Sequence, residues 1–367
     1  MPPDLQHHPY SALTPDVVLD ALASVGLCGD GRLTALSSYE NRVYQVGLET
    51  DPVAGADHPA SVVAKFYRPN RWSDAQILEE HAFAAELMAA EIPMVGPLVL
   101  EGATLHRFGG FAFSVSPRRG GRAPELDDFE VLEWTGRFIA RIHNVGAARP
   151  FNGRPALDLP SFGSESRDWL INHDCVPLDV RADWLKACNV ALEIIAINDQ
   201  YTRALGTFIA ENAPKAVSSG QNPSETPPPV QILRLHGDCH PGNILWTPAG
   251  ESGEGPHFVD LDDCRSGPAV QDLWMLLSGE RADRTAQLSG LLDGYEQLRP
   301  FDRRELVLIE PLRTLRLIHY SAWLARRFAD PTFPIHFPWF GTSDYWKDQT
   351  VLLREQCEVM QQDPLML

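Results

Sequence analysis

The 367-residue sequence predicts an α+β protein with two lobes, in which a small antiparallel sheet of five strands with one helix precedes a mainly helical large lobe. Short strand-like runs separated by turn residues fill the first third of the chain, and this pattern favours an antiparallel sheet. Beyond residues 117–124, which are rich in Gly, Arg and Pro, apolar residues recur at helical spacings. We therefore expect one domain in residues 1–115 and a second in residues 116–367.

The small lobe is expected to begin with a helix at residues 14–26. A second helix at residues 74–90 is predicted by its helix-forming composition and by Ser73 and Gln76, which are spaced as in a capping box. Runs of β-branched and aromatic residues bounded by turn residues predict five strands, at residues 33–37, 43–48, 61–67, 103–108 and 111–115.

The large lobe is expected to open with a long helix that starts at Asp127 and Glu130, because the apolar residues that follow return every three or four positions. Residues 211–230 are rich in Pro, Ser, Asn and Gln, which predicts an exposed insertion or a disordered loop, and we assign this segment no catalytic role. Further helices are predicted at residues 183–197, 270–277, 286–295 and 303–327, and short strands at residues 231–235 and 257–259.

Composition narrows the function classes. A formal charge of −18 argues against a general nucleic-acid binder, which needs a basic face to displace counterions. The six cysteines include no C-x-x-C pair, which suits reduced thiols in the cytosol. The chain begins without the features of a signal peptide, and no segment approaches the roughly 20 apolar residues that span a bilayer. We expect a cytoplasmic monomer without nucleic-acid or membrane partners.

The most informative motif is His-Gly-Asp-Cys-His-Pro-Gly-Asn at residues 236–243, followed by a predicted strand that runs into Asp260. This order is typical of ATP-dependent phosphoryl transfer. Asp238 is the candidate catalytic base for the acceptor hydroxyl. Asn243 and Asp260 offer the oxygen ligands that Mg²⁺ on the triphosphate requires, and Asp262 is a further candidate for a second metal ion.

Three residues of the small lobe are candidates for ATP binding. Lys65 ends the run Val-Val-Ala-Lys in a predicted strand, where a lysine pairs with the phosphates and with a glutamate of the next helix. Glu80 is the preferred partner over Glu79. A Gly-rich phosphate loop is missing between the first two strands, and Ser38 stands there as the candidate phosphate contact.

Residues near these motifs allow other interpretations. His236 and His240 are spaced as in some zinc sites, although the Pro and Gly that follow argue against the helix such a pair needs. Cys239 and Cys264 lie beside the motifs and raise the possibility of redox sensing. Asp272 is expected to support the catalytic loop. An aromatic cluster is expected to serve packing rather than a substrate groove, and comprises Phe333, Phe337, Trp339, Phe340, Tyr345 and Trp346.

These residues carry a family resemblance. The strings LRLHGDCHPGNILW, FVDLDD, GPAVQDLWMLL, SYENRVYQ, VAKFYRP and QILEEH resemble the stress response kinases of bacteria, the YihE or RdoA type of Ser/Thr protein kinase, which belongs to the aminoglycoside phosphotransferase and choline kinase-like group. The resemblance implies a two-lobed protein kinase-like fold and a cytoplasmic enzyme that uses ATP and magnesium in stress responses. It also implies that Asp238 is the proton acceptor, Asn243 and Asp260 the magnesium ligands and Ser38 a residue of the ATP site. Residues 51–59 and 211–230 depart from the family pattern.

Two enzymatic functions and one non-enzymatic function remain open at this point. The first is a Ser/Thr protein kinase with ATP as co-substrate and a protein as acceptor. The second is a small-molecule kinase that phosphorylates an alcohol, amino alcohol or aminoglycoside with the same catalytic residues, and the acidic composition suits a cationic acceptor. A pseudokinase would normally have lost the base, the lysine or a metal ligand, and this sequence keeps all of them.

Overall fold

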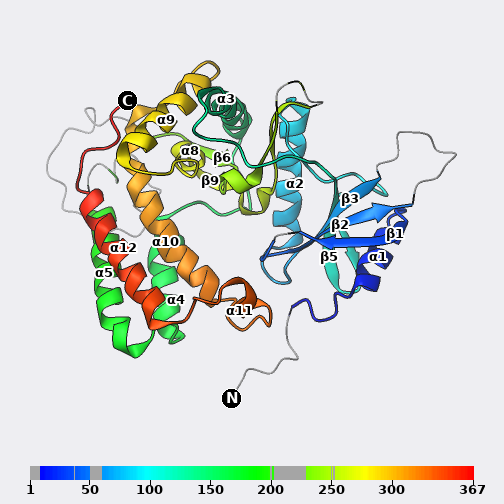
Figure 1. Ribbon diagram of the computed structural model, residues 1–367, viewed down its shortest axis with the longest axis horizontal. Coiled ribbons are helices and arrows are strands. Elements are labelled where there is room, and N and C mark those ends of the chain that lie inside the picture. The colour runs from blue at the N-terminus through cyan, green and yellow to red at the C-terminus, as the bar shows by residue number, and fades with distance from the viewer. Residues whose placement is uncertain are drawn as a thin grey trace.

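The small lobe is built on one antiparallel sheet with strand order β1-β2-β3-β5-β4 (Figure 1). The computed structural model describes residues 9–36, 38–49, 60–198, 201, 229–248, 250 and 253–367. The predicted loop at residues 51–59 and most of the predicted insertion at residues 211–230 lie outside these residues. The strands are β1 Gly29–Ala35, β2 Arg42–Leu48, β3 Ser61–Phe66, β4 His106–Phe108 and β5 Phe111–Pro117.

The two faces of this sheet have different roles. Helix α1 (Pro15–Ala23) covers one face, where Val62, Ala64 and Phe66 of β3 are buried against it. Because side chains alternate along a strand, Lys65 projects from the opposite face. Helix α2 (Asp74–Ala89) begins at a capping box of Ser73 and Gln76 and stands between the sheet and the large lobe (Figure 1).

The large lobe is mainly helical and carries two short hairpin-like pairs of strands. The pairs are β6 with β9 and β7 with β8, both antiparallel. The pairing of β6 with β9 brings together the two ends of the segment that contains β7, β8 and the predicted catalytic residues. The helices are α3 Phe129–Gly146, α4 Glu165–Asn172, α5 Leu178–Ile197, α8 Val270–Trp274, α9 Arg281–Tyr295, α10 Ile309–Ala325, α11 Phe333–His336 and α12 Ser343–Val359, and the strands are β6 Ile232–Leu235, β7 Ile244–Thr247, β8 Gly255–Phe258 and β9 Arg265–Pro268.

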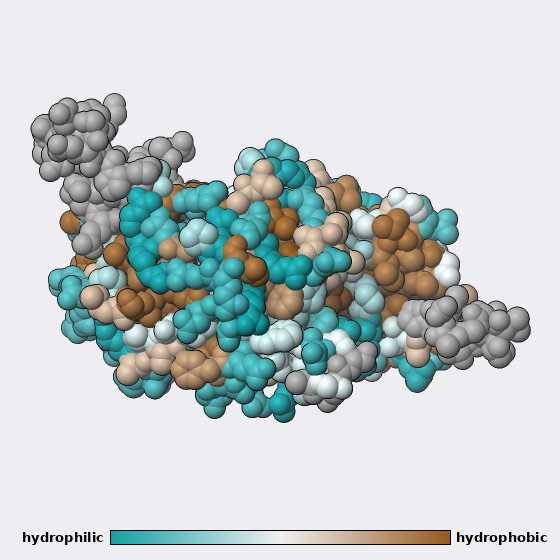
Figure 2. All heavy atoms as spheres, turned by 90° about the horizontal axis from the view of Figure 1, so that it is seen from above, coloured by the Kyte–Doolittle hydropathy of each residue, from teal (hydrophilic) through white to brown (hydrophobic). Residues whose placement is uncertain are grey.

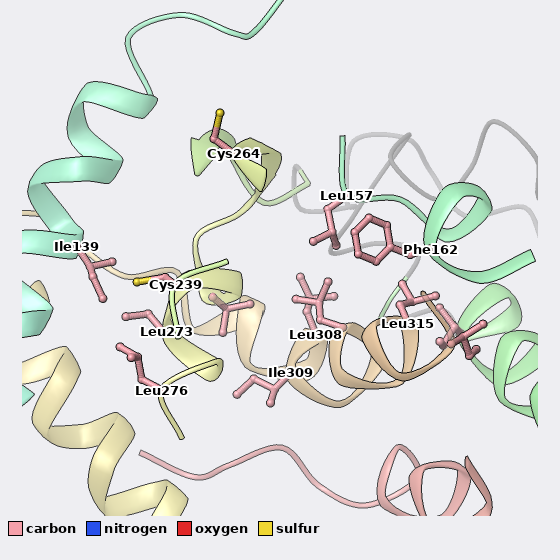
Figure 3. Close-up of a cluster of buried hydrophobic side chains, with 14 of the residues drawn as sticks. Ile139, Leu157, Phe162, Cys239, Cys264, Leu273, Leu276, Leu308, Ile309 and Leu315 are labelled. Atoms are coloured by element: carbon pink, nitrogen blue, oxygen red, sulfur yellow. The ribbon is translucent and has the colours of Figure 1, made fainter. Parts of the chain in front are cut away.

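The main hydrophobic core lies mostly in the large lobe and includes Cys239 and Cys264, which stand beside the motifs that carry Asp238 and Asp260. Figure 3 shows Leu273 and Leu276 near Ile139 of α3, with Leu308 and Leu315 of the α10 region further along. Burying such side chains is the dominant favourable term in folding and fixes the loops that rest on them. The outer surface seen in Figure 2 is largely hydrophilic, with scattered hydrophobic patches.

Most predicted elements are confirmed with shifted ends, and two differ in a way that has a physical reason. Strand β1 begins at Gly29, earlier than predicted, because its pairing with Leu48 overrides the turn-like Gly-Asp-Gly sequence. The helix predicted at residues 303–327 is divided into a 3₁₀ turn (Arg303–Leu308) and α10. Pro311 lies in the first turn of α10, where its missing N–H costs no helical hydrogen bond.

Other helices also differ from prediction: α9 begins five residues before its predicted start at 286, and α4 and α11 were not predicted. The long helix α3 is capped by Asp128 rather than Asp127, since the Asp128 carboxylate accepts from the Glu130 N–H at 2.8 Å. Helix α5 begins at Leu178, five residues before the predicted start at 183. Helix α12 was not predicted, although Thr342 caps its first turn.

Candidate active site

Lys65 lies at the centre of a group of carboxylates that come from both lobes. Its Nζ is 3.1 Å from Asp260 Oδ1, 3.2 Å from Asp262 Oδ1 and 3.7 Å from Glu80 Oε1. Glu80 is supplied by α2, and the two aspartates follow β8 in the large lobe. The structure therefore brings the predicted lysine, its preferred glutamate and Asp260 together.

Burial and charge act in opposite directions within this group. Desolvation alone would lower the pKa of Lys65, but Asp260, Asp262 and Glu80 outweigh it and hold that pKa well above the ordinary value, so the ammonium persists. Burial raises the pKa of Glu80 to about 7, against the opposing pull of Lys65. The lysine is therefore cationic near neutral pH, while Glu80 titrates there.

Glu79, the alternative partner of Lys65, serves a different purpose. Its carboxylate accepts from the backbone N–H groups of Asn152, Gly153 and Arg154, at 2.5, 2.9 and 2.8 Å. These contacts tie α2 to the chain that follows α3 in the large lobe. Glu79 thus fixes the helix that presents Glu80.

The loop that carries Asp238 is held from below by Asp272 of α8. The Asp272 carboxylate accepts from the N–H groups of His236 and Gly237, each at 2.9 Å, and contacts His143 Nε2 at 3.1 Å. His236 also bonds through Nε2 to the Val259 carbonyl at 2.9 Å, so the loop and the segment before Asp260 are joined. The expectation that Asp272 supports this loop matches this geometry.

Asp238 faces the space between the lobes, and its carboxylate has close neighbours. Arg316 of α10 places Nη2 2.9 Å from Asp238 Oδ1, a contact that sequence reasoning missed. Asn243 Nδ2 donates to the Asp238 carbonyl at 2.9 Å and lies 3.5 Å from Oδ2. His240 Nε2 is also 3.5 Å from Oδ2. The side chain of Asp238 remains 24% exposed.

Asn243 and Asp260, the two predicted magnesium ligands, lie close together along the chain segment that follows the Asp238 loop. The Val259 N–H donates to the Asn243 carbonyl at 3.0 Å, so the residue before Asp260 pairs directly with Asn243. Since the Asn243 amide nitrogen is used by Asp238, its side-chain oxygen is left for a cation. Asp260 adopts a left-handed backbone with φ 61° and keeps 46% of its side chain exposed. These are hard oxygen donors of the kind Mg²⁺ selects.

Asp262 is anchored by cations rather than presented to solvent. Its side chain is 4% exposed and pairs with both Lys65 and Arg71. Although burial alone would raise the pKa of Asp262, Arg71 and Lys65 lower it. Arg71 also contacts Asp263 at 2.8 Å. The use of Asp262 for a second metal ion, raised by the sequence, stays a prediction.

Ser38 lies in the loop between β1 and β2 at the edge of the same cavity. Its neighbours Tyr39 and Glu40 reach across to the large lobe, where Glu40 Oε2 accepts from Trp323 Nε1 at 2.7 Å. Glu40 also pairs with Arg327. The loop that stands in place of a Gly-rich phosphate loop is therefore docked on α10.

One cavity of about 490 Å³ collects these groups between the lobes. The predicted residues among its lining are Ser38, Asp238, Asn243 and Asp260. Lys65 lies next to the cavity, because it forms an ion pair with Asp260 in the lining, and Glu80 lies behind it as the second partner of the lysine.

Within the part of the chain that the structure describes, no group of three or more His, Cys, Asp or Glu side chains is arranged to hold a metal ion, and this gives no support to zinc at His236 and His240. Cys239 and Cys264 are fully buried, and burial raises the pKa of both thiols, which opposes a reactive thiolate. The aromatic cluster packs as expected, with Phe333 and Trp346 fully buried.

Among the described helices, none is both long enough and sufficiently apolar to cross a bilayer.

A lysine on a five-stranded sheet that faces a loop aspartate and the oxygen-bearing side chains of Asn243 and Asp260 across a cleft is the arrangement of enzymes that transfer phosphate from ATP. The fold and the site therefore define the class of ATP-dependent kinases.

Comparison with known proteins places the chain within this class. Residues 32–307 match the model of the phosphotransferase enzyme family. Stress response kinase A of Escherichia coli (strain K12) is 43% identical over 98% of this chain and 97% of its own length. The serine/threonine protein kinase RdoA of Salmonella typhimurium (strain LT2) is 41% identical over the same shares.

A solved structure of an amicoumacin kinase with AMP-PNP and Ca²⁺ shares the fold, with a TM-score of 0.65 and 18% identity over 96% of this chain and 94% of that one. The chain belongs to the phosphotransferase enzyme family, in the group of stress response kinase A, and is an ATP-dependent phosphotransferase.

Proposed function

We propose that this protein is a Ser/Thr protein kinase of the stress response that transfers the γ-phosphate of ATP to a protein hydroxyl. The name of the relative that is 41% identical, a serine/threonine protein kinase, supports a protein acceptor, and the name of the relative that is 43% identical supports a role in the stress response. The observation that carries the chemistry is the shared cavity, in which Asp238 and Asp260 face the same space below the sheet that bears Lys65. We further propose that residues 1–115 bind the nucleotide and residues 116–367 carry catalysis and the acceptor.

Each residue has one step in this mechanism. Asp238 accepts the proton of the acceptor hydroxyl as the hydroxyl oxygen bonds to the γ-phosphorus and the bond to the bridging oxygen of ADP breaks. Lys65, held cationic by its carboxylates, offers positive charge to the phosphates, and Glu80 keeps it in place. Ser38 is proposed to contact the phosphates from the β1–β2 loop.

Asn243 and Asp260 are the residues that would hold a divalent ion, with Mg²⁺ as the proposed cofactor. When bound, the ion neutralises charge on the phosphate oxygens. The left-handed backbone of Asp260 turns its carboxylate out of the β8 end and into the cavity. Asn243 stays oriented because its amide nitrogen donates to the Asp238 carbonyl.

A small-molecule acceptor is the second candidate function. The fold is shared with a kinase named for the small molecule amicoumacin, and the catalytic groups do not distinguish the two kinds of acceptor.

The acceptor can be identified with ATP labelled at the γ-phosphate. The label is offered to the kinase alone, to a set of Ser- and Thr-containing peptides and proteins, and to a panel of alcohols, amino alcohols and aminoglycosides. We expect label on Ser or Thr of the peptides and proteins. Label confined to a small alcohol would refute the protein kinase proposal and establish the alternative.

A further inference from the structure

We call the part of the cavity lined by Asp238 and by Arg316, Tyr320 and Trp323 of α10 the acceptor side, and it carries a cation beside the proposed base. Arg316 lies on α10 with its guanidinium 2.9 Å from Asp238 Oδ1. Its side chain remains 38% exposed, so it is open to the cavity that it lines. On the other oxygen, Asn243 and His240 each lie 3.5 Å from Oδ2. Oδ1 of the base therefore forms an ion pair with Arg316 but accepts no hydrogen bond from the residues that the structure describes, and an incoming hydroxyl must compete with that cation to reach it.

The carboxylates that line this cavity are already matched with cations in the described structure. A cationic acceptor would have to break one of these pairs before it could form its own, at a cost that rises with burial. The pairs are Glu40 with Arg68, Asp260 with Lys65, Asp262 with Lys65 and Arg71, and Asp263 with Arg71 and Arg265.

Arg316 differs from these cations because its partner is Asp238, the carboxylate that must be free to accept a proton in the proposed mechanism. A guanidinium can bind a carboxylate or phosphate through two parallel N–H donors. One turn further along α10, Tyr320 stacks on Trp323 with ring centroids 5.7 Å apart and an angle of 9° between the planes. Both rings line the cavity together with Arg316.

We propose that Arg316 is a specificity-determining residue that binds an anionic group close to the acceptor hydroxyl, as in a Ser or Thr flanked by Asp or Glu. Binding of that group draws the guanidinium away from Asp238 Oδ1, and the freed oxygen accepts the hydroxyl proton. The inference rests on the proposed role of Asp238 and deepens it, since it names the chemical class of the acceptor. It also opposes the cationic acceptors that the overall acidic composition suggested.

The test compares two synthetic peptides with Mg²⁺ and ATP. Each has one Ser in an Ala and Gly background, flanked on both sides by Asp in the first peptide and by Lys in the second. For the wild-type enzyme we expect kcat/KM to be at least tenfold higher with the Asp peptide. Arg316→Gln should abolish this preference, mainly through a higher KM for the Asp peptide, while KM for ATP stays within about twofold.

Two further variants separate recognition from structure. Arg316→Lys keeps the charge without the planar fork and should retain part of the preference. Arg313→Gln is the matched control, because Arg313 lies on the same helix but pairs with Glu310 at 3.3 Å. It should keep the full preference. A wild-type enzyme that favours the Lys peptide or neither, or an equal loss in Arg313→Gln and Arg316→Gln, would overturn the inference.

Glycerate and choline serve as a second pair of acceptors, one anionic and one cationic. If neither peptide is phosphorylated but glycerate is favoured over choline in an Arg316-dependent manner, the inference holds and the protein kinase proposal fails. If choline is favoured, both fail. Transfer to none of the four acceptors would also refute both.

Discussion

Two adjacent glutamates on α2 show how local surroundings set the charge of a side chain. Glu80 is buried, and burial raises its pKa to about 7 despite Lys65. Glu79 is also partly desolvated, but three backbone N–H donors overcome this effect and lower its pKa. The same residue type, one position apart, is therefore expected to show opposite pH dependence.

Glu80→Gln should reveal the contribution of Glu80 to stability. A group whose pKa is higher in the folded state contributes stability below its ordinary pKa of 4.5 and loses it as pH rises through about 7. The free energy of unfolding of Glu80→Gln relative to wild type should therefore increase between about pH 4.5 and 8, by up to about 3 kcal/mol. Urea denaturation at several pH values measures this difference.

Glu79→Gln is the matched control for that experiment. Because the pKa of Glu79 is lowered, its contribution is present above its ordinary pKa of 4.5 and is lost as pH falls. Its variant should be less stable than wild type at neutral pH, and the deficit should shrink in acid. Parallel pH profiles for the two variants would contradict the assigned environments.

At the scale of elements, helices α3 and α9 approach each other through glycines. A methyl group added at Gly136 would lie 1.9 Å from the Leu291 carbonyl oxygen, and one at Gly294 would lie 1.9 Å from the Glu133 carbonyl oxygen. No two non-bonded heavy atoms tolerate such a distance, so the close packing of α3 and α9 requires glycine at positions 136 and 294. Helix α3 also carries His143, which contacts Asp272 beneath the catalytic loop.

Gly136→Ala should force α3 and α9 apart. We expect it to lower the free energy of unfolding by about 2–3 kcal/mol, the usual cost of overpacking. Gly290→Ala on α9 is the control, because its methyl group would lie 3.0 Å from Leu132 Cδ1 and 3.2 Å from Leu132 Cβ, so that it meets side-chain atoms at a longer distance rather than a backbone carbonyl at 1.9 Å. That variant should stay within about 1 kcal/mol of wild type. Equal stability of the two variants by chemical denaturation would contradict the close approach.

Local patterns predicted the elements better than their ends. The capping box of α2 was predicted because its two residues lie three positions apart. The start of β1 was not, since it depends on pairing with β2 rather than on its own Gly-rich sequence. Helix α12 was not predicted because its composition is polar on average, although its buried residues Trp346, Thr350, Leu353 and Cys357 recur at helical spacings.

At the scale of the whole molecule, the two lobes are joined at the mouth of the cleft. Tyr39 packs on Phe337 near α11 with ring centroids 5.0 Å apart, and its hydroxyl donates to Asp330 at 3.2 Å. Arg68 of the small lobe also binds Asp330, at 2.5 Å. These contacts connect residues about three-quarters of the chain apart and set the β1–β2 loop against the large lobe.

The same scale explains which site residues the sequence could indicate. Asp238, Asn243 and Asp260 stand in short motifs whose spacing is chemically meaningful, and the structure gathers them in one cavity. Arg71 and Arg316 carry no such local signal, because their partners lie 191 and 78 positions away and are brought near only by folding. The sequence offers one hint of Arg71 and Arg316: the closely spaced aspartates at 260, 262 and 263 predict that cations from elsewhere in the chain lie near them.

The most direct test of the account is the rate of phosphate transfer by Asp238→Asn, measured in a single turnover with labelled ATP and an acceptor that the wild-type enzyme uses. The variant keeps the shape of the side chain and removes the base, so we predict a loss of about 10²–10⁴-fold in rate with ATP affinity and folding unchanged. A rate within about threefold of wild type would contradict the assignment of this cleft and its aspartate to catalysis.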